Sequence, residues 1–138
     1  MVKIQIPKSY FSSLISSIKN CIAKGKNKFV SHYSRFNSMI CEYMLKNFFF
    51  SEVYYLVSLK NKIYFIFVVI GNFDGNLLLN DIKNFYKPSK PIYLKVFQIK
   101  KFFKKSKSVF LLSTSEGIVN SLEALDLRVG GLLLFEYY

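Results

Sequence analysis

The stretch that decides the fold lies in the C-terminal third, where residues 111–119 read Leu111-Leu112-Ser113-Thr114-Ser115-Glu116-Gly117-Ile118-Val119. Apolar residues from Val109 to Leu112 predict a buried strand. Three hydroxyl residues then end this strand, and Gly117 permits a sharp turn. We expect a short helix after the turn, because three apolar residues recur there at helical spacing: Ile118, Leu122 and Leu125.

This hydroxyl loop is suited to a sugar–phosphate ligand. Short hydroxyl side chains donate and accept hydrogen bonds, and a helix beginning after the loop would add free N–H groups and a positive dipole. The loop residues Ser113, Thr114, Ser115 and Gly117 can therefore hold phosphate oxygens and ribose hydroxyls without recognising a base sequence. A purely structural helix cap is the alternative, since Ser/Thr-rich loops often cap helices.

The flanks of this loop indicate a small β-rich subdomain. Downstream, we expect the helix to end near Gly130-Gly131 and a strand to close the chain from Leu132 to Tyr138. Upstream, Lys87-Pro88-Ser89-Lys90-Pro91 marks a boundary, because two closely spaced prolines interrupt regular structure. A strand is predicted from Ile92 to Phe97 by its alternation.

The first half of the chain predicts two helices on a small sheet. The first helix lies between Ser9 as its cap and Gly25 as its stop, with Phe11, Leu14, Ile15, Ile18 and Ile22 on one face. The second runs from Ser34 to Asn47. A strand hairpin follows at about residues 53–59 and 62–70, and then a third strand or short helix at 77–85. The fold class is therefore α+β, with an N-terminal α/β subdomain at residues 1–86 and a mostly β C-terminal subdomain with short helices at 87–138.

The charge of the chain points to a polyanionic partner. The 138 residues contain 20 Lys and Arg against 8 Asp and Glu, a formal charge of +12. Residues 83–107 hold nine lysines and no acid, including Lys100 and Lys101 in a basic patch at 100–105. Such a block repels itself unless a polyanion offsets it. Nucleic acid and an anionic membrane surface are the two candidates.

The composition also indicates a genome rich in A and T. Residues with A/T-rich codons are abundant, with 18 Lys, 15 Phe and 10 Tyr, whereas the chain has only 2 Arg, 6 Gly and 3 Pro. Such a bias is common in organelles and in some parasites and endosymbionts. We therefore expect a mitochondrial, organelle-encoded protein, with the plastid as the alternative.

We expect neither a membrane-spanning helix nor a signal peptide. The longest apolar run, Ile63 to Ile70, has eight residues, whereas a membrane-spanning helix needs about 20. The first seven residues are too few and too mixed for a signal peptide. Cys21 and Cys41 fall on separate predicted helices, so we expect two free buried thiols, with a disulfide as the alternative.

We expect no metal, cofactor, small-molecule substrate or catalytic activity. The single histidine, His32, has no partners at the spacing of a catalytic triad, and one His with two Cys gives no zinc ligand set. Two aromatic runs leave alternatives open. Phe48-Phe49-Phe50 is either core or an exposed protein contact, and Phe102-Phe103 either packs internally or stacks on bases.

The hydroxyl stretch, followed after four residues by Ala124, resembles the signature of the S8 family of small-subunit ribosomal proteins. Tyr86-Lys87-Pro88-Ser89 followed by Ile92-Tyr93 is similar to that family's basic loop and tyrosine-bearing strand. Gly130-Gly131 with its short apolar strand is similar to the family's closing segment. Leu14 to Asn20 and Ser34 to Lys46 are similar to its first two helices, so the resemblance covers roughly residues 9–138. The chain departs from the family at Ser89, where Gly is usual, and at Leu132, where an acidic residue is usual.

This resemblance implies a structural protein of the small ribosomal subunit that binds a central-domain helix of the ribosomal RNA (rRNA) early in assembly. The resemblance further implies that the RNA-holding loop consists of Ser113, Thr114, Ser115 and Gly117. The flanking contacts are Lys87, Pro88, Ser89 and Tyr93, and a secondary contact is Ser34 with Arg35. Neighbouring small-subunit proteins are the other expected partners. The alternative from another class is a basic peripheral membrane or membrane-assembly protein that binds anionic lipid.

Overall fold

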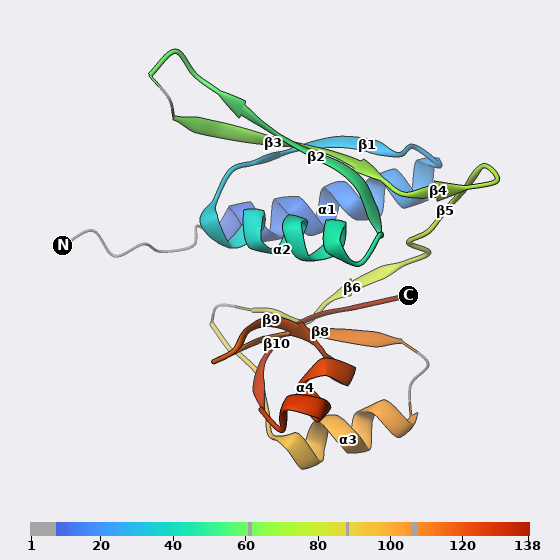
Figure 1. Ribbon diagram of the computed structural model, residues 1–138, viewed down its shortest axis with the longest axis vertical. Helices are drawn as coiled ribbons and strands as arrows, with labels where there is room; N and C mark the ends of the chain where they lie inside the picture. The colour runs from blue at the N-terminus through green and yellow to red at the C-terminus, as the bar shows by residue number, and fades with distance from the viewer. Residues whose placement is uncertain (1–7, 61, 88, 106–107) are drawn as a thin grey trace. The chain divides into compact units, whose positions relative to one another are not determined.

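The computed structural model describes residues 8–60, 62–87, 89–105 and 108–138 and divides the chain into two compact units, 1–79 and 80–138 (Figure 1). The two prolines of the 87–91 loop predict a division at residue 86/87. The structural division comes earlier because strand β6 (Ile82–Asn84) pairs with strand β10 (Gly131–Tyr137) of the second unit. Pairing with a distant strand, rather than the position of the prolines, assigns β6 to its unit.

The N-terminal unit has the predicted two helices on a small sheet. The elements run α1 (Lys8–Lys24), β1 (Lys28–His32), α2 (Arg35–Lys46), β2 (Phe50–Val57) and β3 (Ile63–Ile70). The strands form an antiparallel sheet in the order β1-β3-β2. Figure 1 shows α1 and α2 on the same side of this sheet. The predicted hairpin of strands is therefore confirmed, with β2 starting three residues earlier than expected.

Helix α1 follows from its apolar spacing. Phe11, Leu14, Ile15 and Ile18 are all buried. The helix ends as predicted at Gly25, whose φ of 68° suits a residue without a Cβ, and the Lys26 N–H then donates to the Cys21 carbonyl. Ser9 lies inside α1, so its prediction as the cap is wrong: the helix begins at Lys8.

Helix α2 has a clear polar start. Ser34 has extended backbone geometry and its Oγ accepts from the Asn37 N–H at 3.0 Å, which satisfies one of the free amides at the helix start. The buried Asn37 side chain donates in turn to the carbonyls of Tyr10 and His32. These bonds tie α1, β1 and α2 together at one point.

The two cysteines are free and buried, as predicted. Burial raises the pKa of the Cys41 thiol to about 12, because a thiolate is poorly solvated among apolar side chains. Both residues therefore act as small apolar core residues on their helices.

Three short strands follow β3 along the chain and lead into the C-terminal unit. Strands β4 (Asn72–Phe73) and β5 (Asn76–Leu77) form a tight hairpin around Asp74 and Gly75, whose φ values are 51° and 79°. The element expected at 77–85 is therefore β5, an irregular segment with buried Leu79, and β6. The Phe48–Phe50 run is divided: Phe50 is 1% exposed and Phe48 is 79% exposed.

The C-terminal unit is mostly β with short helices, as predicted. Its further elements are β7 (Tyr93–Leu94), α3 (Val96–Lys105), β8 (Val109–Thr114), β9 (Gly117–Asn120) and α4 (Ser121–Leu127). The sheet order is β6-β10-β8-β9, and β7 also pairs with β10. Its core is a cluster of apolar residues from both helices and the sheet: Leu94, Ile99, Phe110, Leu112, Val119, Ala124 and Leu133.

Two predictions for this unit are wrong. The strand expected from Ile92 to Phe97 ends at Leu94, and a helix starts at Val96, because Ile99 reaches the core at helical spacing from it. The helix expected directly after Gly117 is preceded by β9, since the backbone there pairs with β8. Helix α4 begins after Asn120, whose Oδ1 accepts from the Glu123 N–H at 2.8 Å, and it ends at Leu127 rather than at Gly130.

Among the described residues, no helix combines the length and apolarity that crossing a membrane requires.

The Ser34 cap provides a test of this fold. We expect Ser34→Ala to lower the free energy of unfolding by about 1 kcal/mol, because the Asn37 N–H loses its acceptor. Ser16→Ala, an exposed change inside α1, is the matched control and should leave stability unchanged or slightly raised. Urea unfolding of both variants measures the difference, and equal midpoints would contradict the capping role.

Candidate nucleic-acid interface

The hydroxyl stretch forms the turn of a β-hairpin between β8 and β9. Thr114 pairs with Gly117 across the turn, and Ser115 and Glu116 lie at its tip. The Thr114 hydroxyl donates to the Gly117 carbonyl at 2.9 Å and accepts from the Glu116 N–H at 3.1 Å. Thr114 therefore holds the turn in shape, and Gly117 completes it with a φ of 103° that disfavours any side chain.

Three strands meet beside this turn. Strand β10 lies between β7 and β8, so that Leu132 pairs with Tyr93 on one side and with Ser113 on the other. A Cβ on Gly131 would lie 2.6 Å from the Ser113 carbonyl oxygen, and a Cβ on Gly130 would collide with the Leu94 carbonyl. The two glycines therefore let β10 approach both neighbours closely.

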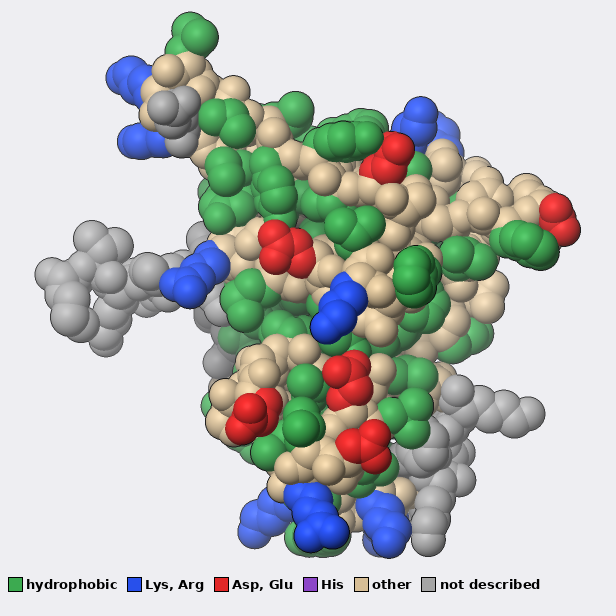
Figure 2. Space-filling view, in the orientation of Figure 1, with side chains coloured by type: hydrophobic (Ala, Val, Ile, Leu, Met, Phe, Trp, Pro, Cys, Tyr) green, Lys and Arg blue, Asp and Glu red, His purple; other side chains and the backbone are tan. Residues whose placement is uncertain are grey.

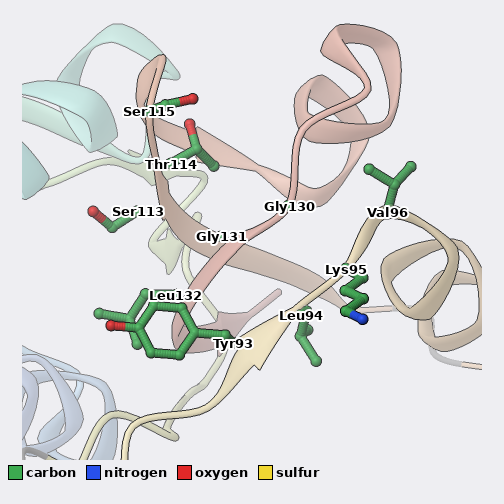
Figure 3. A pocket seen from close by; sticks show the side chains of 10 residues that line it. All are labelled: Tyr93, Leu94, Lys95, Val96, Ser113, Thr114, Ser115, Gly130, Gly131 and Leu132. Atoms are coloured by element: carbon green, nitrogen blue, oxygen red, sulfur yellow. The ribbon is translucent and has the colours of Figure 1, made fainter.

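The close approach leaves an open depression over the glycines. Its volume is about 530 Å³ (Figure 3), and three segments line it: residues 93–96, 113–115 and 130–132. Figure 3 shows Ser113 and Thr114 at the end of strand β8 and Ser115 in the turn that follows, with Tyr93 beyond the strand of Gly131. The side chains of Thr114 and Ser115 point to one side of this segment and that of Ser113 to the other. Tyr93 is 70% exposed and Ser115 is also exposed. Residues with hydroxyl groups, a tyrosine and bare glycine backbone thus border the same depression.

The structure brings four of the predicted site residues to this depression: Tyr93, Ser113, Thr114 and Ser115. Gly117 lies across the turn from Thr114. Lys87 and Ser89 are exposed in the connection between β6 and β7 and do not line the depression. Pro88 was also predicted to take part, and it lies outside the described residues.

One part of the predicted mechanism for the hydroxyl loop is wrong. The expected helix start would have supplied free N–H groups and a positive dipole at the loop. Strand β9 follows the turn instead, and α4 begins only at Ser121. The loop therefore has side-chain hydroxyls and the close strand backbone as its ligand groups, and the helix dipole contributes nothing at its tip.

The predicted basic patch is a face of helix α3. Lys100 and Lys101 are exposed, and Figure 2 shows basic side chains gathered along this helix. Lys101 also lines a smaller depression of about 290 Å³ with Phe97, Gln98 and Phe102. The Phe102 ring is 47% exposed and meets Phe110 edge-on, so it packs internally on one side only. The side chain of Phe103 lies outside the described residues.

The remaining predicted pair, Ser34 and Arg35, belongs to the N-terminal unit. The Ser34 Oγ is already engaged as the cap of α2. Arg35 is the first residue of that helix and is exposed. Of this pair, the arginine has the side chain that is open to a ligand.

Sequence reasoning missed several residues that line the depression, namely Lys95, Gly130, Gly131 and Leu132. The sequence pattern predicts a helix end at Gly130 and Gly131, although two adjacent glycines before an apolar strand also indicate close backbone approach. Among the described residues, no group of three His, Cys, Asp or Glu side chains could hold a metal ion.

Comparison with known proteins gives a consistent result. The family described as ribosomal protein S8 matches residues 10–138. The chain is 28% identical over 127 residues to the small ribosomal subunit protein uS8 of Rhodopseudomonas palustris, which covers 92% of this chain and 95% of the relative. The uS8 protein of Nitrobacter hamburgensis gives the same identity and coverage. That of Neorickettsia sennetsu is 26% identical over 133 residues, with 96% and 100% covered.

The close approach of Gly131 to the Ser113 carbonyl predicts that a side chain at residue 131 destabilises the fold. We expect Gly131→Ala to lower the free energy of unfolding by about 1–3 kcal/mol, because its Cβ would overlap the Ser113 carbonyl and the Thr114 methyl group and push β8 and β10 apart. Gly75→Asn is the control, since nothing lies within 4 Å there and Asn tolerates a positive φ. If Gly131→Ala unfolds in urea at the wild-type midpoint, β8 and β10 can accommodate the added Cβ and the prediction is wrong.

Proposed function

The chain belongs to the ribosomal protein S8 family, and on this premise we propose that it binds small-subunit rRNA through the depression beside its hydroxyl turn. Membership makes it a structural, non-enzymatic component of the small ribosomal subunit. The observation that carries the RNA proposal is the depression itself, where Tyr93, Ser113 and Ser115 surround close-packed glycine backbone.

The chemistry of this depression suits double-stranded RNA. The minor groove of A-form RNA is wide and shallow and displays 2′-hydroxyl groups, so proteins recognise it mainly by shape. Ser113 and Ser115 offer hydroxyls that can both donate and accept, which matches a ribose hydroxyl. Gly130 and Gly131 keep the floor of the depression free of side chains, so a sugar–phosphate backbone can approach the strands.

In this proposal, lysines of the C-terminal unit supply most of the affinity for RNA. Lys95 lines it, and Lys87, Lys100 and Lys101 are exposed in the same unit. Phosphate contacts need charge more than a fixed geometry, so lysine serves there in place of arginine. In this proposal Pro88 and Ser89 flank the bound RNA with Lys87, and Arg35 makes a secondary phosphate contact from the N-terminal unit.

The target and the compartment are also proposed. By family resemblance, the RNA is a helix of the central domain, bound early in assembly beside neighbouring small-subunit proteins. The ratio of 18 Lys to 2 Arg supports an A+T-rich organellar genome and so a mitochondrial ribosome, with the plastid as the alternative.

The salt dependence of RNA binding tests the proposed contacts between lysines and phosphates. If Lys87, Lys95, Lys100 and Lys101 each contact one phosphate of a double-stranded segment, the affinity for a small-subunit rRNA fragment should fall roughly 150-fold between about 50 and 200 mM salt. The variant Lys100→Gln/Lys101→Gln should reduce the slope of log K against log salt by about two. Filter binding measures both. A salt-independent affinity would refute the electrostatic contribution, and binding to anionic vesicles without RNA binding would support the lipid alternative.

Variants of Ser115 and Thr114 distinguish a residue that contacts RNA from one that holds the turn in shape. We expect Ser115→Ala to weaken binding about fivefold with unchanged stability, because an exposed hydroxyl loses its RNA partner. Thr114→Ala should lower both affinity and stability, since the Thr114 hydroxyl bonds the turn, whereas Thr114→Ser should restore both. Ser16→Ala on α1 is the matched control for the first change. An unaltered dissociation constant for Ser115→Ala would move the RNA contact elsewhere.

A further inference from the structure

The N-terminal sheet has one face that α1 and α2 cover and one that points away from them (Figure 1). Residues of the covered face, such as Phe29, Ile66 and Val68, are buried. On the opposite face, the strand register aligns two rows of side chains across β1, β3 and β2. These rows are Val30-Phe67-Tyr54 and His32-Phe65-Leu56, and together we call them the open face. His32 lies at its margin, because its ring also stacks on Tyr10 of α1 at 5.1 Å.

The open face is a continuous apolar surface. Val30, Tyr54, Leu56 and Phe65 are each between 40% and 51% exposed. The rings of Tyr54 and Phe67 lie 6.2 Å apart, and those of His32 and Phe65 lie 5.4 Å apart, so neighbouring side chains touch across the strands. Contiguous apolar surface of this kind is uncommon on isolated proteins and marks interaction sites.

Charged residues border the open face at both ends. The next row of the sheet is Lys28-Val69-Glu52. Beyond the other end lies the turn of the β2–β3 hairpin, where Lys60 and Lys62 are exposed and Figure 2 shows basic side chains at the tip. Three lysines against one glutamate make the border basic, and it complements a partner with acidic residues around its own apolar centre.

The composition of the open face favours protein over RNA. Bases stack on accessible aromatic rings, whereas Val30 and Leu56 are aliphatic and Phe67 is only partly exposed. A hydrogen bond to Glu52 raises the pKa of the Tyr54 phenol, which places a carboxylate beside the exposed ring. A phosphate is therefore disfavoured at the Tyr54 ring itself, where the nearest charge is negative.

We propose that the open face docks a second protein of the small ribosomal subunit, one whose contact surface is apolar at its centre and acidic where it meets the hairpin turn. This inference rests on the proposed ribosomal function but concerns a different surface from the RNA depression. Docking would bury the two rows, and Lys60 and Lys62 would pair with the partner's acidic border.

The test replaces apolar contact by positive charge. In Tyr54→Lys/Leu56→Lys, added charge cannot weaken electrostatic RNA binding, but it must disrupt an apolar protein interface. Met39→Lys on α2 is the matched control, because Met39 is 40% exposed and lies outside the open face. Leu56→Lys alone serves if the double variant unfolds, and circular dichroism verifies each fold.

Each variant is assembled with small-subunit rRNA and the other small-subunit proteins, and quantitative mass spectrometry measures the composition of the particles. We expect affinity for naked rRNA within about twofold of wild type and at least a roughly tenfold loss of one neighbouring protein. Wild-type composition would overturn the docking proposal. A parallel loss of rRNA affinity would also overturn it, since the face would then contact RNA. If the wild-type chain itself fails to bind rRNA, the proposed function fails and this proposal with it.

Discussion

The contact between Gly131 and the carbonyl of Ser113 is the constraint on which the C-terminal unit depends. Strand β10 pairs with β6, β7 and β8, so it joins the whole sheet of this unit. At its start, space for a Cβ is missing on the side of Ser113 and, one residue earlier, on the side of Leu94. Close packing there brings Tyr93 and the hydroxyl residues to one depression, so the same glycines shape both the fold and the candidate RNA surface.

The three hydroxyl residues, Ser113, Thr114 and Ser115, have different roles at this site. Thr114 uses its hydroxyl within the turn, as donor to Gly117 and acceptor from Glu116. Ser115 extends from the tip, and Ser113 borders the depression. Sequence alone treats these three neighbours as equivalent, because each has the same functional group. Their different roles follow from the hairpin, which turns one hydroxyl inward against the backbone and leaves another exposed.

The N-terminal unit shows how far periodicity predicts structure. Phe11, Leu14 and Ile18 predicted α1 because helical spacing alone places them on one face, and the positive φ at the end of the helix favours the glycine found there, Gly25. The sequence could not predict that Tyr54 and Leu56 lie beside Phe67 and Phe65. That proximity depends on the register of β2 against β3, which is a pairing between distant residues.

Local patterns therefore determined α1, α2, most strands, the excess of lysine and the family resemblance, since each depends on residues near one another in sequence. Tertiary structure decided the rest. It placed β6 with the C-terminal unit, replaced the expected helix after Gly117 by β9, and started α3 at Val96. In each case hydrogen bonds or burial against a distant segment outweighed local preference, because the backbone adopts whichever pairing also completes the core.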